Sequence, residues 1–128
     1  MIVDGNNVLG SRPDGWWRDR AGATRRLVER LGAWSARTGE ELVVVFDGAP
    51  PPGLVAPPGV DVRFAPGPGP GAADDAIAAL VAAAPERMQV VTSDAGLARR
   101  VRAHGAEVVG AGGFRDRVDP PLSSGGER

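Results

Sequence analysis

The sequence contains no lysine and no cysteine, and its single histidine is His104. All 15 basic residues are therefore arginine. These absences exclude a P-loop lysine, a Schiff-base lysine, thiol chemistry, disulfides and nearly every type of zinc site. Any chemistry that this protein performs has to use carboxylates, hydroxyls, amides and arginine.

Long apolar runs and a strong net charge are also missing. No run approaches the ~20 apolar residues of a membrane-spanning helix. The first residues lack the basic and apolar segments of a signal peptide. With a formal net charge of −1, the chain as a whole is not a polybasic nucleic-acid binder. We expect a cytoplasmic protein without a membrane partner, in which any contact with nucleic acid uses a local basic surface.

Short β-branched runs alternate with helical patterns along the 128 residues, a length that suits one domain. Five runs are predicted to be strands: 1–3, 42–46, 60–64, 88–92 and 106–109. The spacing of apolar residues predicts three helices: 19–38, 74–84 and 95–104. The proline-rich segment 48–59 is long enough to cross between parallel strands as a loop.

This alternation predicts an α/β fold of the Rossmann-like type. We expect three layers, α/β/α, around a mainly parallel five-stranded sheet. If the first strand is central, the strand order is 3-2-1-4-5. We assign residues 1–118 to this domain and predict a disordered tail over 119–128, which is polar.

Carboxylates follow three of the predicted strands, and two more open the second helix. In a doubly wound sheet, strand carboxyl ends and the starts of the following helices share one edge, where ligands bind. Carboxylates gathered there repel one another unless a cation lies between them. Oxygen ligands without histidine or cysteine favour Mg²⁺ or Mn²⁺, which can activate water for attack on a phosphodiester. The predicted ligands are Asp4, Asp47, Asp74, Asp75 and Asp94.

Each of these acids also has an ordinary structural explanation. Asp74 and Asp94 are typical helix N-cap residues. Asp4 and Asp47 each precede a glycine, as in common turn dipeptides. Their convergence on one predicted sheet edge favours the functional interpretation.

The segment 11–20 combines two tryptophans with three arginines. Tryptophan stacks on unpaired bases and arginine binds phosphate. We predict RNA contacts here and on the third helix, by Arg12, Trp16, Trp17, Arg18, Arg20 and Arg99. At least one of the two tryptophans is expected to pack against the sheet or a helix instead.

Four short motifs occur in a fixed order within residues 1–110. They are IVDGNNV at 2–8, VFDG at 45–48, ADD at 73–75 and VTSD at 91–94. In these motifs the sequence resembles the NYN branch of the PIN-like ribonucleases, close to the YacP-type proteins. The resemblance implies a PIN-like fold and cleavage of RNA with Mg²⁺ or Mn²⁺.

The resemblance also implies roles for particular residues. Asp4, Asp74 and Asp94 would be the catalytic, metal-binding acids. Asp47 matches a further acidic position, and the site would be supported by Asn6, Asn7 and Ser93.

RNA, including ribosome-associated or structured RNA, is the expected partner. Many PIN-like sites carry another acid shortly after the last aspartate, where this chain has Ala95 and Gly96. A non-catalytic RNA-binding domain of the same fold is therefore the alternative, followed by a protein-interaction domain without RNA affinity.

Overall fold

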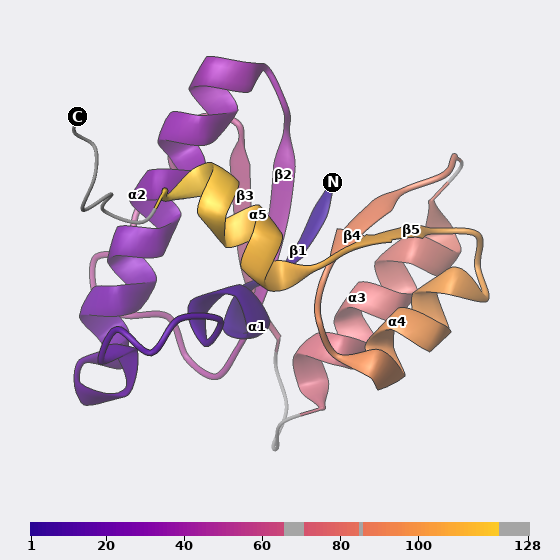
Figure 1. Cartoon of the computed structure of the whole chain (residues 1–128), viewed down its shortest axis with the longest axis horizontal. Helices are drawn as coiled ribbons and strands as arrows, with labels where there is room; N and C mark the ends of the chain where they lie inside the picture. The colour runs from indigo at the N-terminus through magenta and orange to yellow at the C-terminus, as the bar shows by residue number, and fades with distance from the viewer. Residues whose placement is uncertain (66–70, 85, 121–128) are drawn as a thin grey trace.

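The computed structural model describes residues 1–65, 71–84 and 86–120. These residues form a five-stranded sheet (Figure 1). Its strands are β1 (Ile2–Asp4), β2 (Leu42–Asp47), β3 (Val60–Ala65), β4 (Gln89–Val91) and β5 (Glu107–Val109). Their order is β3-β2-β1-β4-β5, and every neighbouring pair is parallel. The predicted strand order is confirmed.

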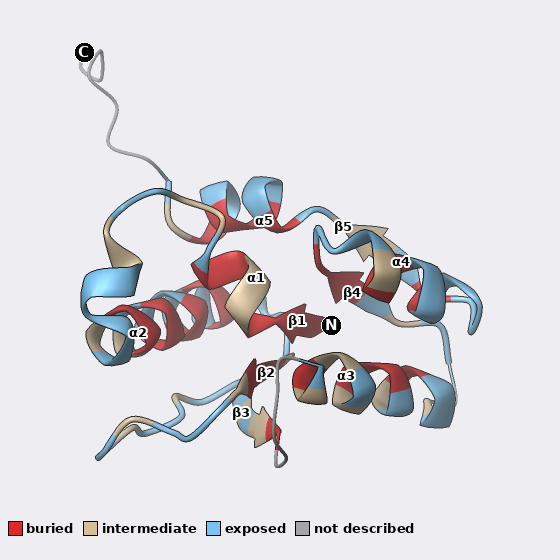
Figure 2. Cartoon of the chain, turned by 90° about the horizontal axis from the view of Figure 1, so that it is seen from below, coloured by how far each residue is buried: buried red, intermediate tan, exposed pale blue. Residues whose placement is uncertain are grey.

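Helices cover both faces of the sheet (Figure 2). They are α1 (Gly5–Leu9), α2 (Arg20–Thr38), α3 (Ala72–Ala83), α4 (Ala95–Arg102) and α5 (Ala111–Val118), with a 3₁₀ turn, η1 (Trp16–Arg18). One apolar core joins α1, α2 and α5 to the sheet, and a second joins α3 and α4 to its other face. This confirms the three predicted layers.

The continuous apolar strands follow from this double coverage. Alternate residues of β2 face opposite cores: Val44 and Phe46 belong to the core of α2, and Val45 belongs to that of α3. A strand buried on both faces has no polar face, so it lacks the alternation of a half-exposed strand. Gly39 ends α2 at φ +80°, a conformation that favours glycine.

The connection from β2 to β3 contains no helix within 48–59, as the sequence predicts. It packs against α2. The guanidinium of Arg25 donates to the carbonyl of Pro52 at 2.6 Å. A Cβ added at Gly32 would lie only 2.5 Å from the Pro57 ring, so glycine there permits the close approach.

Three helical elements were not predicted: α1, η1 and α5. With five and three residues, α1 and η1 are too short to show a helical period. α5 contains Gly112 and Gly113, which are poor helix formers. Tertiary packing compensates, because Phe114 is fully buried and meets the Trp34 ring edge-on at 5.2 Å.

The last described residues are held to the domain. Asp119, the first position of the predicted tail, forms ion pairs with Arg12, Arg30 and Arg115. Residues 121–128 lie outside the described residues, so the disorder expected there stays a prediction. Among the described helices, none has the length and apolar character to span a membrane.

Candidate active site at the carboxyl edge of the sheet

Four aspartates meet at the carboxyl edge of the sheet, the lower edge in Figure 1. Asp4 and Asp47 end β1 and β2, Asp94 follows β4, and Asp74 lies in the first turn of α3. The charges of Asp74 and Asp94 both raise the pKa of Asp4. Those of Asp94 and Asp47 raise the pKa of Asp74. We refer to these four residues as the acidic cluster.

Asp4 is the buried member of the cluster, with 4% of its surface exposed. Burial raises its pKa from 3.8 to about 6, and the charges of Asp74 and Asp94 add to that effect. A hydrogen bond from the Thr92 hydroxyl to Asp4 Oδ2, 2.9 Å long, acts in the opposite direction. Because burial outweighs the hydrogen bond, the Asp4 carboxyl is a weaker acid than an exposed aspartate.

Asp74 and Asp94 differ in what else they do. Asp94 is the N-cap of α4, and its Oδ1 accepts a hydrogen bond from the Leu97 amide at 2.9 Å. Asp74 is not a cap, because the N-cap of α3 is Gly71. Partial burial and the neighbouring carboxylates raise the pKa of Asp74, while Arg100 lowers it. The N-cap interpretation therefore holds for Asp94 and is wrong for Asp74.

Asp47 and Asp75 both have defined partners. Asp47 Oδ1 accepts a hydrogen bond from the Ala73 amide at 2.8 Å, which links the end of β2 to the start of α3. The Asp75 side chain is 75% exposed and pairs with Arg100 at 2.9 Å. The structure brings four of the five predicted acids together and leaves Asp75 on the surface.

The predicted supporting residues connect the segments that carry the acids. Asn6 Oδ1 accepts from the Asp47 amide at 3.0 Å, and Asn7 Oδ1 accepts from the Ser93 amide at 2.7 Å. Ser93 Oγ in turn accepts from the Ala111 amide at 2.8 Å. Through these bonds α1 fixes the ends of β2 and β4 on either side of Asp4.

Sequence reasoning gave no role to Thr92, which is buried beside Asp4. Its hydroxyl donates to Asp4 and accepts from the Asp94 amide at 3.1 Å, so one side chain connects two members of the acidic cluster. The available signal was a hydroxyl at the end of the predicted strand 88–92, which was expected to lie beside the first strand.

The predicted RNA contacts fall into two groups. Trp17 is 55% exposed, with the Arg18 guanidinium 5.8 Å from its ring centroid, and Arg20 and Arg99 are exposed. Trp16 is half-buried and packs against the core of α1 and α2. One tryptophan therefore packs and the other is accessible.

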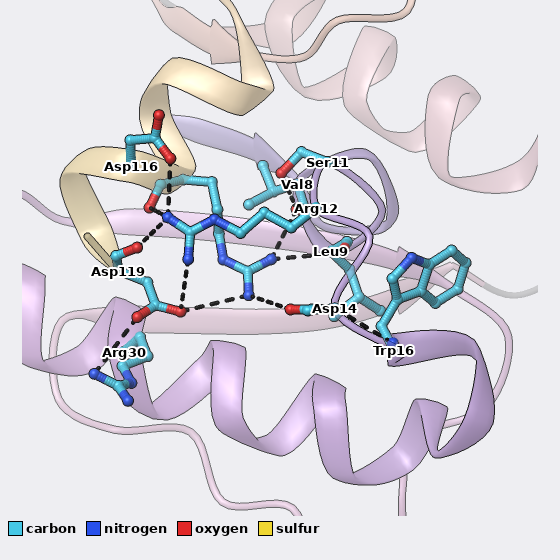
Figure 3. A network of polar contacts seen from close by, with 10 residues as sticks. Val8, Leu9, Ser11, Arg12, Asp14, Trp16, Arg30, Asp116 and Asp119 are labelled. Carbon is cyan, nitrogen blue, oxygen red and sulfur yellow. Dashed lines mark hydrogen bonds and ion pairs between the residues drawn. The ribbon is translucent and has the colours of Figure 1, made fainter. Parts of the chain in front are cut away.

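Arg12, also predicted to contact RNA, lies in a network of polar contacts between α1 and α5 (Figure 3). Its guanidinium pairs with the carboxylates of Asp116 at 2.9 Å and Asp119 at 3.4 Å, and donates to the Asp119 carbonyl. Arg12 is thus bound within the domain, and an RNA contact by it stays a prediction.

Arg115 lies at the centre of this network and is 7% exposed. It donates to the carbonyls of Val8 and Leu9 at the end of α1, at 3.1 and 3.5 Å. It also pairs with Asp14 at 3.3 Å and Asp119 at 3.4 Å. Among the described residues its Nε has no hydrogen-bond partner. Sequence reasoning missed this residue, because a single arginine in α5 gives no sign of burial.

The acidic cluster offers only oxygen donors to a metal. Within the described part of the chain, no three acidic or histidine side chains form a ready-made ligand group. Mg²⁺ accepts such an arrangement, because it keeps several waters and is bound through one or two carboxylates together with substrate phosphates. The donor set therefore fits Mg²⁺ or Mn²⁺.

The parallel sheet of order 3-2-1-4-5, with carboxylates at its carboxyl edge, defines a Rossmann-like α/β domain of the PIN-like class. A family model for the YacP-like NYN domain matches residues 1–122. The chain belongs to this family, and the resemblance in the four motifs is confirmed. The family assignment points to a nuclease-type function related to RNA.

Solved structures agree with this assignment. The crystal structure of Rae1 (YacP) from Bacillus subtilis is 26% identical, with a TM-score of 0.74. A point mutant of the same protein is 25% identical, with a TM-score of 0.73. Each match covers 92% of this chain and 72% of the Bacillus chain. No curated protein matches the sequence.

Proposed function

We propose that this domain is a metal-dependent endoribonuclease that hydrolyses phosphodiester bonds of RNA. The observation that carries the proposal is the acidic cluster at the ligand-binding edge of the sheet, where neighbouring carboxylates raise the pKa of Asp4 and of Asp74 in addition to burial. Membership of the YacP-like NYN family supports a nuclease-type function. RNA, including ribosome-associated or structured RNA, is the proposed substrate, and the cytoplasm is the proposed location.

Asp4, Asp74 and Asp94 are the proposed catalytic acids and would hold Mg²⁺ or Mn²⁺, with Asp47 at the rim. When bound, the ion supplies positive charge for the phosphate and lowers the pKa of a bound water. The hydrogen bond from Thr92 orients Asp4, and the cap of α4 orients Asp94. The chain thus presents carboxylates in fixed positions before any ligand arrives.

The accessible aromatic and basic side chains give this edge a surface for the RNA strand. Trp17 and Arg18 lie in η1, and Arg20 begins α2. Exposed tryptophan stacks on unpaired bases, and exposed arginine binds phosphate. Arg99 adds a positive charge on α4, beyond Asp94. The strand would therefore run across the acidic cluster between α2 and α4.

A non-catalytic RNA-binding domain is the second candidate. It is favoured by Asp94, which uses one carboxylate oxygen to cap α4. The two candidates differ in turnover and not in affinity for RNA.

The variants Asp74→Asn and Asp75→Asn test the proposal directly. They remove the same charge from adjacent residues, and only Asp74 belongs to the acidic cluster. With Mn²⁺ and a mixture of RNAs, we expect Asp74→Asn to lower cleavage by at least about 100-fold, and Asp75→Asn to change it by less than about threefold. Gel analysis of the products and of RNA binding in EDTA provides both readouts.

Three results lead away from the proposal. Retained RNA binding without metal-dependent cleavage by the wild type favours the non-catalytic candidate. Absence of both binding and cleavage rejects both candidates. Equal loss of cleavage in the two variants means that the acidic cluster is not the site.

A further inference from the structure

A small cavity opens beside the acidic cluster, next to Asp47. Its lining residues come from the start of α2, the ends of β2 and β3, and the connection between these strands. Its volume is about 160 Å³. One water takes up about 30 Å³ and sites for drug-sized ligands about 300–1,000 Å³, so this cavity suits one small ring system. Larger cavities around Met1 and around Gln89 include no member of the acidic cluster.

Phe64 gives the cavity an aromatic wall. It is half-buried and stacks on Phe46, with ring centroids 5.2 Å apart and an angle of 19° between the ring planes. Phe46 is its register partner on β2 and is buried. Because this support fixes the ring before a ligand binds, a flat aromatic group can stack there without an ordering cost.

Three polar side chains line the same cavity: Asp47 of the acidic cluster, Thr24 and Arg20. Thr24 is 4% exposed, and its hydroxyl has no hydrogen-bond partner within residues 1–65, 71–84 and 86–120. That hydroxyl is therefore free to donate to, or accept from, a polar atom of an occupant. Arg20 is exposed and forms no ion pair with a described residue. Its N–H groups suit a carbonyl oxygen, a ring nitrogen or a phosphate.

We propose that this cavity holds one unpaired nucleobase of the RNA strand, stacked on Phe64 and hydrogen-bonded by Thr24 and Arg20. The proposal rests on the proposed function in taking RNA as the ligand. A base seated here fixes the position of the strand relative to Asp47 and the other acids. The cavity therefore determines which nucleotide lies next to the cleaved bond.

Binding in EDTA tests this proposal without requiring cleavage. The probes are short oligouridylate and oligoadenylate strands and an abasic ribose-phosphate strand of the same length, measured by fluorescence anisotropy. Phe64→Leu removes the aromatic face and keeps the charge. We expect it to weaken the binding of base-bearing strands by about 5- to 150-fold and to leave the abasic strand unchanged.

Thr24→Val is the second variant, because it removes the hydroxyl at nearly constant volume. We expect the same selectivity with a smaller factor, about tenfold or less. Arg63→Gln is the matched control, since Arg63 lies next to Phe64 on β3 and does not line the cavity. It should affect the two kinds of strand equally. Thermal unfolding of each variant verifies that the fold is kept.

The outcomes separate this proposal from the proposed function. Equal weakening for both kinds of strand, or no weakening in either variant, overturns the nucleobase site. Base-dependent binding that Phe64→Leu removes, in a protein that cleaves no RNA, supports the site and rejects the endoribonuclease. Cleavage with the same nucleotide preference in the wild type and both variants keeps the endoribonuclease and overturns the site.

Discussion

Helix α1 lies between two charged regions of opposite character. At its start, the acidic cluster gathers four carboxylates, where burial and neighbouring carboxylates raise the pKa of Asp4 and of Asp74, and Arg100 partly offsets the effect at Asp74. At its end, the arginine–aspartate network pairs each charge with an opposite one (Figure 3). The network consists of Arg12, Arg30, Arg115, Asp14, Asp116 and Asp119.

The difference separates charges that are paired within the fold from carboxylates that lie close together with little compensation by cations. Arg115 binds the last carbonyls of α1, and Asn6 and Asn7 near its start bind the ends of β2 and β4. The network therefore fixes the helix that positions the acidic cluster. Carboxylates left with raised pKa values lower the stability of the protein without metal, as is common at functional sites.

The largest effect is expected from breaking the network at its centre. Arg115→Leu removes the guanidinium that pairs with Asp14 and Asp119 and binds the end of α1. The substitution leaves the partly buried carboxylates of Asp14 and Asp119 without this positively charged partner. We therefore expect a loss of about 3–5 kcal/mol in the free energy of unfolding. Urea unfolding followed by circular dichroism measures it.

Arg30→Ala is the control for this prediction. Arg30 is largely exposed and reaches Asp119 at 3.6 Å, so its removal should change the free energy of unfolding by less than about 1 kcal/mol. Arg115→Lys should recover only part of the loss, because lysine lacks the planar fork of donors. Similar values for Arg30→Ala and Arg115→Leu would contradict a central role for Arg115.

A substitution in the acidic cluster is expected to raise the free energy of unfolding, whereas one in the network lowers it. The pKa of Asp4 is raised from 3.8 to about 6 in the native state, so folding favours its protonated form. The destabilisation of the native state by the ionised Asp4 carboxyl is absent below the unfolded pKa, 3.8, and grows as the pH rises from there to about 6. Without metal at about pH 7.5, Asp4→Asn should therefore raise the free energy of unfolding by about 1–3 kcal/mol.

Unfolding of the wild type and of Asp4→Asn over a range of pH, with a chelator present, tests this sign. The difference should disappear below about pH 3, where the wild-type carboxyl is protonated in both states. Adding Mg²⁺ or Mn²⁺ should stabilise the wild type more than the variant. A variant that is less stable than the wild type at neutral pH would show that the Asp4 charge is compensated in the fold.

Most of the sheet could be predicted from the sequence, because strands buried in a parallel sheet have short Val-rich sequences. The order of the strands followed from placing the first predicted strand, 1–3, at the centre. The elements that were missed owe their form to partners distant in sequence. α5 keeps its two glycines only because Phe114 and Arg115 are buried against α1 and α2.

The sequence predicts which residues gather at the candidate site better than it predicts what each of them does there. Three strand-end positions and one helix start placed four aspartates at the same edge, because that placement depends only on topology. It could not separate Asp74 from Asp75, since their difference lies in which side of α3 each one faces. Nor could it identify Thr92 or Arg12 as residues that bind the protein's own carboxylates, because those contacts join distant segments.

The smallest change in the free energy of unfolding is expected for the exposed ion pair beside the acidic cluster. Arg100 pairs with Asp75 at 2.9 Å, and both side chains are well exposed. Arg100→Gln should therefore lower the free energy of unfolding by less than about 1 kcal/mol.

Because Arg100 lowers the pKa of Asp74, its removal should raise that pKa further, and high salt should suppress the change. A carboxyl titration of Asp74 by NMR at low and high salt measures this. A large loss of stability without a change in that titration would mean that Arg100 acts as part of the fold, as Arg115 does, and leaves the charge of the acidic cluster unaffected.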